Sequence, residues 1–356
     1  MNLKRTDLEN YGTHRARLLI LYTGGTFGMT HDKDGTLIPF DFASILEHLP
    51  IVKNLGLAFS VFSFEEPIDS SNVGPQHWQL IGQLIYEHYH THDGFVILHG
   101  TDTMAYTASA LSFMLENLSK PVVLTGAQLP ITEPRSDARE NLITALEIAS
   151  ARQNGNAVVP EVCIYFDYEL LRGNRSKKVE SMQFDAFDSG NYPALAKAGV
   201  KIDYNHSVIR QPGKEPLTLH THFETQVAIL KLFPGISQQV VYSVLGIKGL
   251  RAVILETYGS GNAPTIPWLI DGLAEAIREG VLVLNISQCP GGTVMQGRYA
   301  TSRELVNIGV VSGADMTTEA AVTKLMLLLG RYDTATTCTL IQKNLAGELT
   351  LPDVPR

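Results

Sequence analysis

Short apolar runs alternate with segments of helical spacing along the first half of the chain. Four runs rich in branched residues predict strands, at 17–23, 95–98, 122–125 and 162–166. Between them, apolar residues recur at helical spacing over 104–118 and 137–149 and predict amphipathic helices. Strands that are apolar throughout and separated by helices are typical of a parallel sheet covered on both faces. We therefore predict an α/β fold, in which ligands bind at the carboxyl ends of the strands.

The alternation stops at 206–225, which is polar and punctuated by Pro and Gly, and it then restarts. Strand patterns return at 227–232, 252–255 and 281–286, with a helical pattern at 237–245. The sequence predicts two α/β domains with a parallel-rich sheet in each. We expect a larger N-terminal domain over 1–205, a linker over 206–225 and a smaller C-terminal domain over 226–356.

Composition narrows the class of protein and of partner. The chain has 356 residues and a net charge of −8, and it shows no basic face for nucleic acid or an anionic membrane. No apolar run approaches the roughly 18 residues of a membrane span. The N-terminus also lacks the apolar stretch of about 7–15 residues that an export signal needs. Three widely spaced cysteines, Cys163, Cys289 and Cys338, are expected to be buried thiols in a reducing compartment. We expect a cytoplasmic protein.

Two predicted strands end in glycine-bearing turns that present hydroxyl groups. Gly24 and Gly25 precede Thr26, and such a turn exposes backbone N–H groups beside the hydroxyl. The turn matches neither the phosphate-loop nor the dinucleotide fingerprint. After the next strand, Gly100 is followed by Thr101 and Asp102, of which helix capping would account for one.

A threonine hydroxyl is a weak nucleophile until a base removes its proton. A lysine, alone or paired with an aspartate, can do so when it is partly desolvated. Lys177 and Lys178 are the candidates, although a basic loop in solvent would also explain them. The histidines at 88, 90 and 92 are expected in a solvated loop, and no hydrolase elbow or zinc motif is present. The residues indicate acyl transfer or amide hydrolysis through threonine, without metal or cofactor.

Several motifs resemble those of one family. Residues 22–26 (YTGGT) and 99–103 (HGTDT) resemble the two signature motifs of the L-asparaginase/glutaminase family. Residues 93–118 are similar to the cytoplasmic, type I, bacterial branch of that family. Further segments match the same branch, at 172–175 (RGNR), 184–187, 259–264 (GSGNAP), 287–289 and 299–301. The resemblance extends over about residues 16–350.

The resemblance implies hydrolysis of L-asparagine to L-aspartate and ammonia, with no metal and no cofactor. Thr26 matches the nucleophilic threonine, which forms an acyl intermediate. Lys178 and Asp102 match the residues that poise Thr101, which activates water or relays protons. Splitting the reaction through an acyl-enzyme makes two easier steps, and amides of the Gly-rich turn can stabilise the oxyanion.

The resemblance also implies how substrate is held and how subunits assemble. Asp69, Ser70 and Ser71 match the segment that binds the α-amino and α-carboxylate groups, together with Thr101 and Asp102. The backbone near Ala127 and Gln128 would touch the leaving amide. Family members are homotetramers built as dimers of dimers. Each site lies between the N-terminal domain of one subunit and the C-terminal domain of another.

Three positions depart from the bacterial pattern. Leu37 stands where a tyrosine is usual, and we hypothesise that Tyr299 supplies the phenol, against the alternative that it only packs. Lys177 and Glu256 stand where bacterial enzymes place a Thr and an Arg at an allosteric asparagine site. Loss of that Arg removes a partner for a carboxylate, so we expect weak or altered activation by asparagine. Counting from RGNR selects Lys178 as the catalytic lysine, with Lys177 as the fallback.

Three alternatives stay open. An enzyme with substantial glutaminase activity is the nearest, because one methylene is worth only about 1–3 kcal/mol in a pocket. A catalytically silent asparagine sensor would have no need to keep Thr26, Thr101, Asp102 and Lys178 together. A transferase, in which an amine replaces water, is the third.

The hypothesis about Tyr299 predicts that Tyr299→Phe lowers kcat/KM for L-asparagine, because the variant loses only the phenol oxygen. Steady-state ammonia release from the purified variant and the wild type measures the effect. Equal kcat/KM values would show that Tyr299 only packs.

Overall fold

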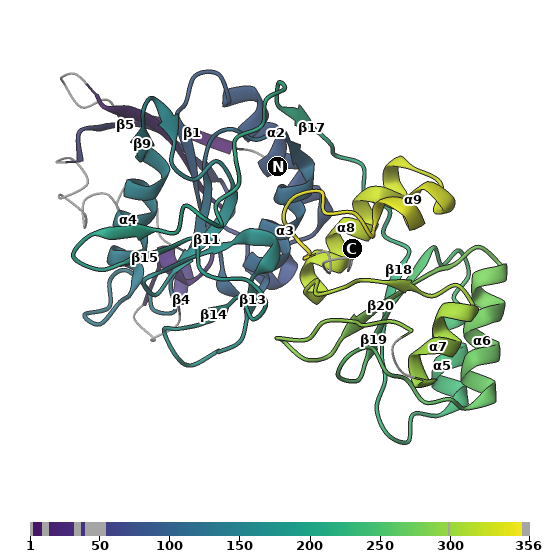
Figure 1. The fold of residues 1–356 in the computed structure, drawn as a ribbon. Helices are drawn as coiled ribbons and strands as arrows, with labels where there is room; N and C mark the ends of the chain where they lie inside the picture. Colours follow the sequence, from purple (N-terminus) through teal and green to yellow (C-terminus); the bar gives the residue numbers. More distant parts are fainter. Residues whose placement is uncertain (1–2, 9–13, 32–36, 40–54, 298–299, 351–356) are drawn as a thin grey trace. The chain divides into compact units, whose positions relative to one another are not determined.

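The structure, a computed structural model, describes the backbone of residues 3–8, 14–31, 37–39, 55–297 and 300–350 (Figure 1). The chain divides into two compact units. The N-terminal unit comprises Met1–Ser189 and Pro193–Leu219, and the C-terminal unit comprises Gly190–Tyr192 and His220–Arg356. Residues 206–219 of the predicted linker therefore belong to the first unit and 220–225 to the second. The predicted domain boundaries at 205 and 226 stay a prediction.

The N-terminal unit is built on a mixed sheet with the strand order β1-β5-β2-β6-β8-β11-β12-β15-β16. The strands are β1 Leu3–Leu8, β5 Leu57–Phe64, β2 Ala16–Tyr22, β6 Gly94–Leu98, β8 Val122–Thr125, β11 Val162–Phe166, β12 Glu169–Arg172, β15 Ala196–Ala198 and β16 Ile202–Tyr204. The five strands from β5 to β11 are parallel, and their neighbours on both sides are antiparallel. The four strands predicted in this half of the chain are confirmed as β2, β6, β8 and β11.

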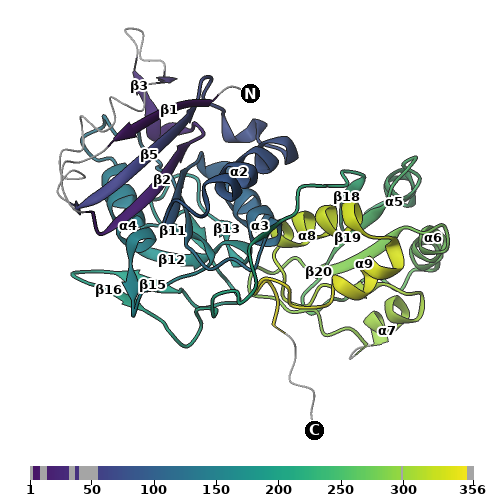
Figure 2. The same cartoon turned by 90° about the horizontal axis from the view of Figure 1, so that it is seen from above.

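Within the described residues, three helices cover this sheet: α2 Pro75–His88, α3 Met104–Met114 and α4 Ala138–Ser150. Figure 2 shows α2 and α3 on one face of the sheet and α4 on the other. The steps from β6 to β8 and from β8 to β11 run in one direction along the sheet, yet α3 and α4 lie on opposite faces. The two crossovers therefore have opposite hands, and one of them is of the rare left-handed kind.

The helix predicted over 137–149 is confirmed as α4, whereas the one predicted over 104–118 is wrong at its C-terminal end. α3 ends at Met114, and the chain continues as the short strand β7 Leu115–Glu116, which pairs with β17 Thr218–Leu219. Asn117 then adopts φ 66°, a conformation that a helix cannot contain. The pairing of β7 with β17 therefore ends the helix at Met114, although the spacing of apolar residues alone would continue it to 118.

Short elements complete the N-terminal unit. Its remaining short strands are β3 Met29–His31, β4 Leu37–Pro39, β9 Arg152–Gln153, β10 Asn156–Ala157, β13 Lys177–Lys178 and β14 Phe187–Asp188. Single turns of 3₁₀ helix are η1 Thr26–Gly28, η3 Ser70–Asn72, η4 Thr101–Thr103 and η5 Gly173–Arg175. Three of these turns, η1, η3 and η4, follow directly or shortly after parallel strands of the sheet.

The C-terminal unit has a parallel sheet with the order β18-β19-β20-β21. Its elements are β18 Val227–Lys231, α5 Gln238–Leu245, β19 Ala252–Thr257, α6 Pro267–Arg278, β20 Leu282–Ser287, α7 Ala300–Asn307, β21 Val311–Ser312, α8 Thr318–Arg331 and α9 Thr334–Leu340. The strands predicted at 227–232, 252–255 and 281–286 and the helix predicted at 237–245 are confirmed. The two-domain α/β fold class is confirmed with them.

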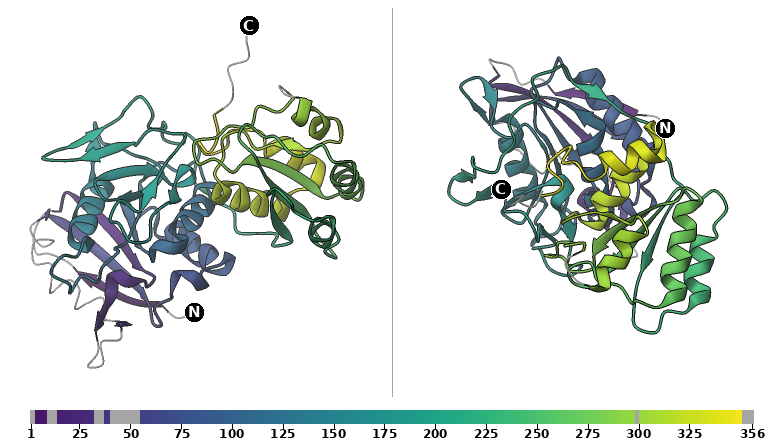
Figure 3. Two further views of the ribbon diagram at one scale, coloured as in Figure 1. Left: turned by 90° about the horizontal axis from the view of Figure 1, so that it is seen from below. Right: turned by 45° about the vertical axis from the view of Figure 1, so that its right-hand side comes forward.

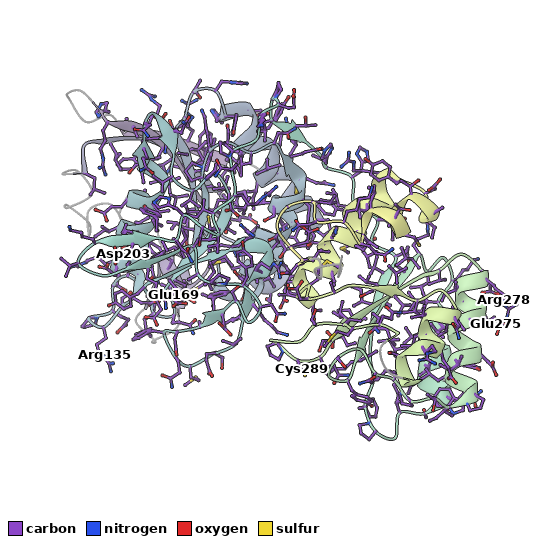
Figure 4. All side chains as sticks on the ribbon, viewed as in Figure 1. Arg135, Glu169, Asp203, Glu275, Arg278 and Cys289 are labelled. Atoms are coloured by element: carbon purple, nitrogen blue, oxygen red, sulfur yellow. The ribbon has the colours of Figure 1, made fainter. Side chains whose placement is uncertain are left out.

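Alternating residues of the C-terminal sheet supply two separate cores. Val253 and Val283 pack in the cluster that contains Leu273 of α6, while Ile254 packs in the cluster that contains Leu325 of α8. This is the period-two alternation of a strand covered on both faces. Figure 3 shows the helices on the two sides of this sheet. The exposed face of α6 carries charged residues, among them the labelled Glu275 and Arg278 in Figure 4.

Two expectations about single residues are corrected. Of the three cysteines only Cys163 is buried, while Cys338 is half-buried and Cys289 is exposed (Figure 4). His92 is also buried rather than solvated, and its ring lies against those of His88 and Phe95. Burial lowers the pKa of His92. Within the described residues, no helix is long and apolar enough to cross a bilayer.

A fully buried ion pair fastens the end of the C-terminal unit to its core. Lys324 Nζ of α8 lies 2.6 Å from Glu348 Oε1, and both side chains are inaccessible to solvent. Lys324 also donates to the carbonyls of Ile341 and Lys343, and Glu348 accepts from the N–H of Ala346. Every charge of the pair therefore has partners, the condition under which a buried pair is tolerated.

Because Glu348→Ala leaves the Lys324 ammonium buried without its counter-charge, we expect a loss of about 3–5 kcal/mol of stability. The thermal unfolding midpoint should fall by several degrees. Lys197→Ala is the matched control, because it breaks the solvent-exposed pair between Lys197 and Glu169 and should leave the midpoint unchanged. Equal midpoints for both variants would contradict the anchoring role of Glu348.

Candidate active site

The sheet of the N-terminal unit reverses its strand order beside β2. The chain passes from β2 to β5 on one side and then returns to β6 on the other side of β2. In parallel α/β sheets, ligands bind outside the carboxyl ends of the strands at such a switch point. The candidate residues follow these strands: Thr26 after β2, Asp69 after β5, Thr101 after β6 and Gln128 after β8.

The turn after β2 is pressed against the turn after β6. Gly25 has φ 85°, and a Cβ built on it would lie 2.5 Å from the Cα of Gly100. Only glycine fits such an approach of two backbones. Thr23 strengthens it, because its N–H and its hydroxyl each donate to the carbonyl of Leu98 at 3.0 Å. Half-buried Thr26, next in the chain, begins η1 beside the second turn.

The side chains of Thr101 and Asp102 do not cap the helix that follows. The N-cap of α3 is Thr103, and that cap has no side-chain hydrogen bond. Lys178 Nζ instead donates to Thr101 Oγ1 at 2.8 Å and to Asp102 Oδ1 at 2.7 Å. The Lys178 side chain is only 17% exposed, whereas that of Asp102 is 65% exposed. The structure thus brings together three of the residues expected to share one catalytic role.

Asp69 is held as an anion on the turn after β5. Its Oδ1 accepts from the N–H and from the hydroxyl of Ser71, both at 2.9 Å. These two hydrogen bonds, the backbone one foremost, lower the pKa of the exposed Asp69 carboxyl. The carbonyl of buried Ser70 accepts from the hydroxyl of Thr103 at 2.6 Å, which ties this turn to η4. A solvent-accessible carboxylate in this position can receive an ammonium group.

The loop after β8, which contains Ala127 and Gln128, is held by half-buried Asp137 and buried Asn141. The Asp137 carboxylate accepts from the N–H of Gln128 and of Leu129 at 3.0–3.1 Å. Burial raises the pKa of Asp137, while these hydrogen bonds favour its charged form. Asn141 donates to Asp137 and to the carbonyl of Gly126, both at 3.1 Å. The backbone of Ala127 and Gln128 is therefore fixed from both sides.

A buried chain of hydrogen bonds through His99, Thr107 and Trp78 supports the turn after β6. The sequence did not predict it. His99 Nδ1 lies 2.7 Å from the carbonyl of Gly100, which only accepts, so this nitrogen carries the proton. His99 Nε2 then accepts from the hydroxyl of Thr107, which in turn accepts from Trp78 Nε1. Burial lowers the pKa of His99 to about 4, so the ring is neutral at physiological pH. The sequence feature that could have indicated this chain of hydrogen bonds is the position of His99 directly after an apolar strand.

The RGNR segment, residues 172–175, stabilises the chain that leads to Lys178. Arg172 lies 2.6 Å from Glu161 in a buried ion pair, and its carbonyl accepts from the hydroxyl of Ser176 at 2.7 Å. These contacts fix the chain just before β13, the strand that carries Lys178. Within the described residues, no group of three or more His, Cys, Asp or Glu side chains is arranged to hold a metal ion.

Comparison with known families shows the family to which both units belong. The model of the N-terminal asparaginase domain matches residues 17–210, and that of the glutaminase/asparaginase C-terminal domain matches residues 226–340. The chain belongs to the L-asparaginase family. Its type I membership agrees with the motifs in which the predicted site residues lie.

Individual relatives are similar over almost the whole chain. L-asparaginase 1 of Escherichia coli (strain K12) is 42% identical over 94% of this chain and 98% of its own length. The crystal structure of L-asparaginase I from Vibrio cholerae is 39% identical, with a TM-score of 0.86 over 95% of this chain and 100% of that one. The mouse 60 kDa lysophospholipase is 41% identical over 94% of this chain, which spans only 63% of that longer relative.

The structure bears differently on two positions involved in the departures from the bacterial pattern, Tyr299 and Glu256. Tyr299 lies outside the described residues. Glu256, expected from the resemblance to replace the bacterial effector-site Arg, is buried in the C-terminal unit. Its carboxylate accepts from the hydroxyl of Thr318 at 2.7 Å and lies 3.8 Å from Lys231 Nζ. A carboxylate repels another carboxylate, so Glu256 is no partner for the carboxylate of an effector.

The geometry at β13 distinguishes the two lysines, because neighbouring residues of a strand point to opposite faces. Lys178→Met should lower the expected asparaginase kcat by about 10²–10⁴-fold, the usual contribution of a proton-transfer group. Lys177→Met, the matched control, should keep it. Ammonia release under saturating L-asparagine measures both, and an equal loss in the two variants would refute the assignment of Lys178.

Proposed function

We propose that this chain is an L-asparagine amidohydrolase that forms an acyl intermediate on Thr26. The observation that carries the proposal is the contact of Lys178 with both Thr101 and Asp102, at 2.8 and 2.7 Å. Thr101 and Asp102 stand on the turn that packs directly against the one bearing Thr26, and Lys178 reaches them from β13. Membership of the L-asparaginase family and the name of the E. coli relative support the same substrate.

In the first half-reaction, the hydroxyl oxygen of Thr26 attacks the side-chain amide carbon of L-asparagine. The bond between Thr26 Oγ1 and that carbon forms, and the carbon–nitrogen bond breaks. The proton from Thr26 leaves with the amide nitrogen, so that ammonia departs. Backbone N–H groups of the turn at Gly25 and Thr26 stabilise the oxyanion, because they are fixed before the reaction begins.

In the second half-reaction, water attacks the acyl carbon and releases L-aspartate. One proton of the water returns to Thr26 as its bond to the carbon breaks, and the other leaves with the product acid. Thr101 accepts a hydrogen bond from the attacking water, and Lys178 with Asp102 holds Thr101 in place. Two steps of moderate barrier replace one difficult hydrolysis.

Three segments would hold the substrate. The Asp69 carboxylate receives the α-ammonium group, and Ser70 and Ser71 receive the α-carboxylate. The loop with Ala127 and Gln128 meets the amide that becomes ammonia. Asp69, Ser70 and Ser71 thus bind the α-ammonium and α-carboxylate groups, which L-glutamine also has. Discrimination against the additional methylene of glutamine is then worth only about 1–3 kcal/mol.

The same resemblance leads us to propose a homotetramer, a dimer of dimers, that acts in the cytoplasm on L-asparagine. Neither nucleic acid nor membrane is an expected partner.

Purified protein should release ammonia from L-asparagine faster than from L-glutamine, with a hyperbolic dependence on asparagine concentration because Glu256 replaces the effector-site Arg. Thr26→Ala should lower kcat by on the order of 10³-fold or more, the scale on which enzymes lose their nucleophile. Thr26→Ser, the matched control, keeps a hydroxyl and should keep measurable turnover.

Other results of the ammonia-release measurement would each contradict a different part of the proposal. A clearly sigmoidal curve would contradict the loss of activation by asparagine. Comparable rates with glutamine would indicate a dual asparaginase and glutaminase. A folded wild type that releases ammonia from neither amide would refute the proposed activity and favour an asparagine sensor.

A further inference from the structure

The side chain of Gln128 lies between Thr101 and the main chain of Gln183. Gln128 Nε2 is 2.9 Å from the carbonyl oxygen of Gln183, and Gln128 Oε1 is 3.2 Å from Thr101 Oγ1. A carbonyl oxygen only accepts hydrogen bonds, so the Gln128 atom that faces Gln183 must be the amide nitrogen. The amide oxygen of Gln128 therefore faces Thr101, and the opposite orientation is excluded by chemistry.

The direction of each hydrogen bond follows from this orientation. Gln128 Oε1 can only accept, so Thr101 must donate its single hydroxyl proton to it. Lys178 Nζ carries only donors and therefore donates to Thr101 at 2.8 Å. The bonds run one way, from Lys178 through Thr101 and Gln128 to the carbonyl of Gln183.

We propose that the side chain of Gln128 is a positioning residue that fixes the direction of the Thr101 hydroxyl proton. With its proton held by Gln128 and one lone pair occupied by Lys178, Thr101 has its second lone pair left as an acceptor. A water molecule in the site can donate to that lone pair. This inference rests on the proposed function, in which Thr101 meets the attacking water, and it gives Gln128 a part beyond the expected backbone contact with the leaving amide.

The surroundings of Gln128 suit this task. Its own backbone N–H is held by the half-buried Asp137 carboxylate, so the side chain extends from a fixed point. Its second partner, Gln183, lies between β13 and β14, on the connection that follows Lys178. One side chain thus ties the segment that carries Lys178 to the hydroxyl that Lys178 contacts.

Gln128→Leu removes both hydrogen bonds and keeps most of the side-chain volume. We expect kcat for L-asparagine to fall about three- to tenfold, the kinetic equivalent of one hydrogen bond, with KM changed by less than about twofold. Gln183→Ala is the matched control, because it removes an exposed side chain but keeps the main-chain carbonyl. It should behave as the wild type, and unchanged unfolding midpoints would show that neither variant is misfolded.

Gln128→Glu supplies a readout that loss of packing would not produce. A protonated carboxyl copies the amide, because one oxygen accepts from Thr101 and the O–H donates to the carbonyl of Gln183. The ionised form places an acceptor against that carbonyl. The ratio of kcat/KM between the variant and the wild type should therefore rise as the pH falls toward the carboxyl pKa, about 4.3 when unperturbed. A ratio independent of pH, or an unchanged kcat for Gln128→Leu, would overturn the proposal while leaving the asparaginase activity standing.

Neutron diffraction from deuterium-exchanged crystals of the wild type tests the proposal without turnover. We expect the Thr101 deuteron on the line to Gln128 Oε1, and a Lys178 deuteron on the line to Thr101 Oγ1. A Thr101 deuteron directed at Lys178 would overturn the role of Gln128. Failure of the proposed function is a separate result, because it would appear as absence of ammonia release whatever the deuteron positions.

Discussion

The close approach of two backbone turns is the constraint on which the site depends. No side chain fits between Gly25 and Gly100, because a Cβ on Gly25 would lie 2.5 Å from the opposite Cα. A Cβ on Gly100 would in turn meet Ser70 Cβ at 2.7 Å. The turns after β2, β5 and β6 are therefore in contact, and each delivers a polar residue to the same place. The switch point of the sheet makes this possible, since it leaves these three strand ends adjacent.

Around this contact, charged groups face the site and neutral groups support it from behind. Asp69 and Asp102 are exposed, and Lys178 lies between solvent and Thr101. Behind them, His99 is buried and neutral, so it can hold the Gly100 carbonyl without adding charge near the lysine. Fixed polar groups of this kind lower the barrier of a reaction only if they do not reorganise as charge develops. The burial of His99 and of Asn141 provides that rigidity.

The sequence predicted the parallel strands because strands buried on both faces are almost entirely apolar, as in β2, β8 and β11. It predicted the positions of Thr26 and Thr101 because glycine-bearing turns at strand ends are local signals. The sequence-based predictions failed where contacts between residues far apart in the chain determine the structure. The end of α3 is set by pairing of β7 with β17, about a hundred residues later. The burial of His92 depends on α2, which the sequence reading did not predict.

Residue types were predicted better than side-chain partners. A run of two lysines marks a candidate base, and counting from RGNR selects Lys178. The contact from Lys178 Nζ to Thr101 Oγ1 itself depends on how β13 pairs with β14, which the sequence does not show. The side chain of Gln128 gave no signal at all, since an amide on a loop is ordinary in composition. Its significance comes from two partners that lie 27 and 55 residues away in the chain.

Residues 259–264 (GSGNAP) of the C-terminal unit have a structural role that differs from that of the N-terminal turns. Gly261 has φ 99°, and its carbonyl accepts from the side chain of buried Asn285 at 3.2 Å. Asn285 in turn accepts from the hydroxyl of Thr257 at 2.7 Å. These polar groups are bonded to one another, and they shape the loop after β19. The loop at 259–264 is thus held by buried polar groups of its own unit, whereas the turn at 99–103 presents the side chains of Thr101 and Asp102 to Lys178.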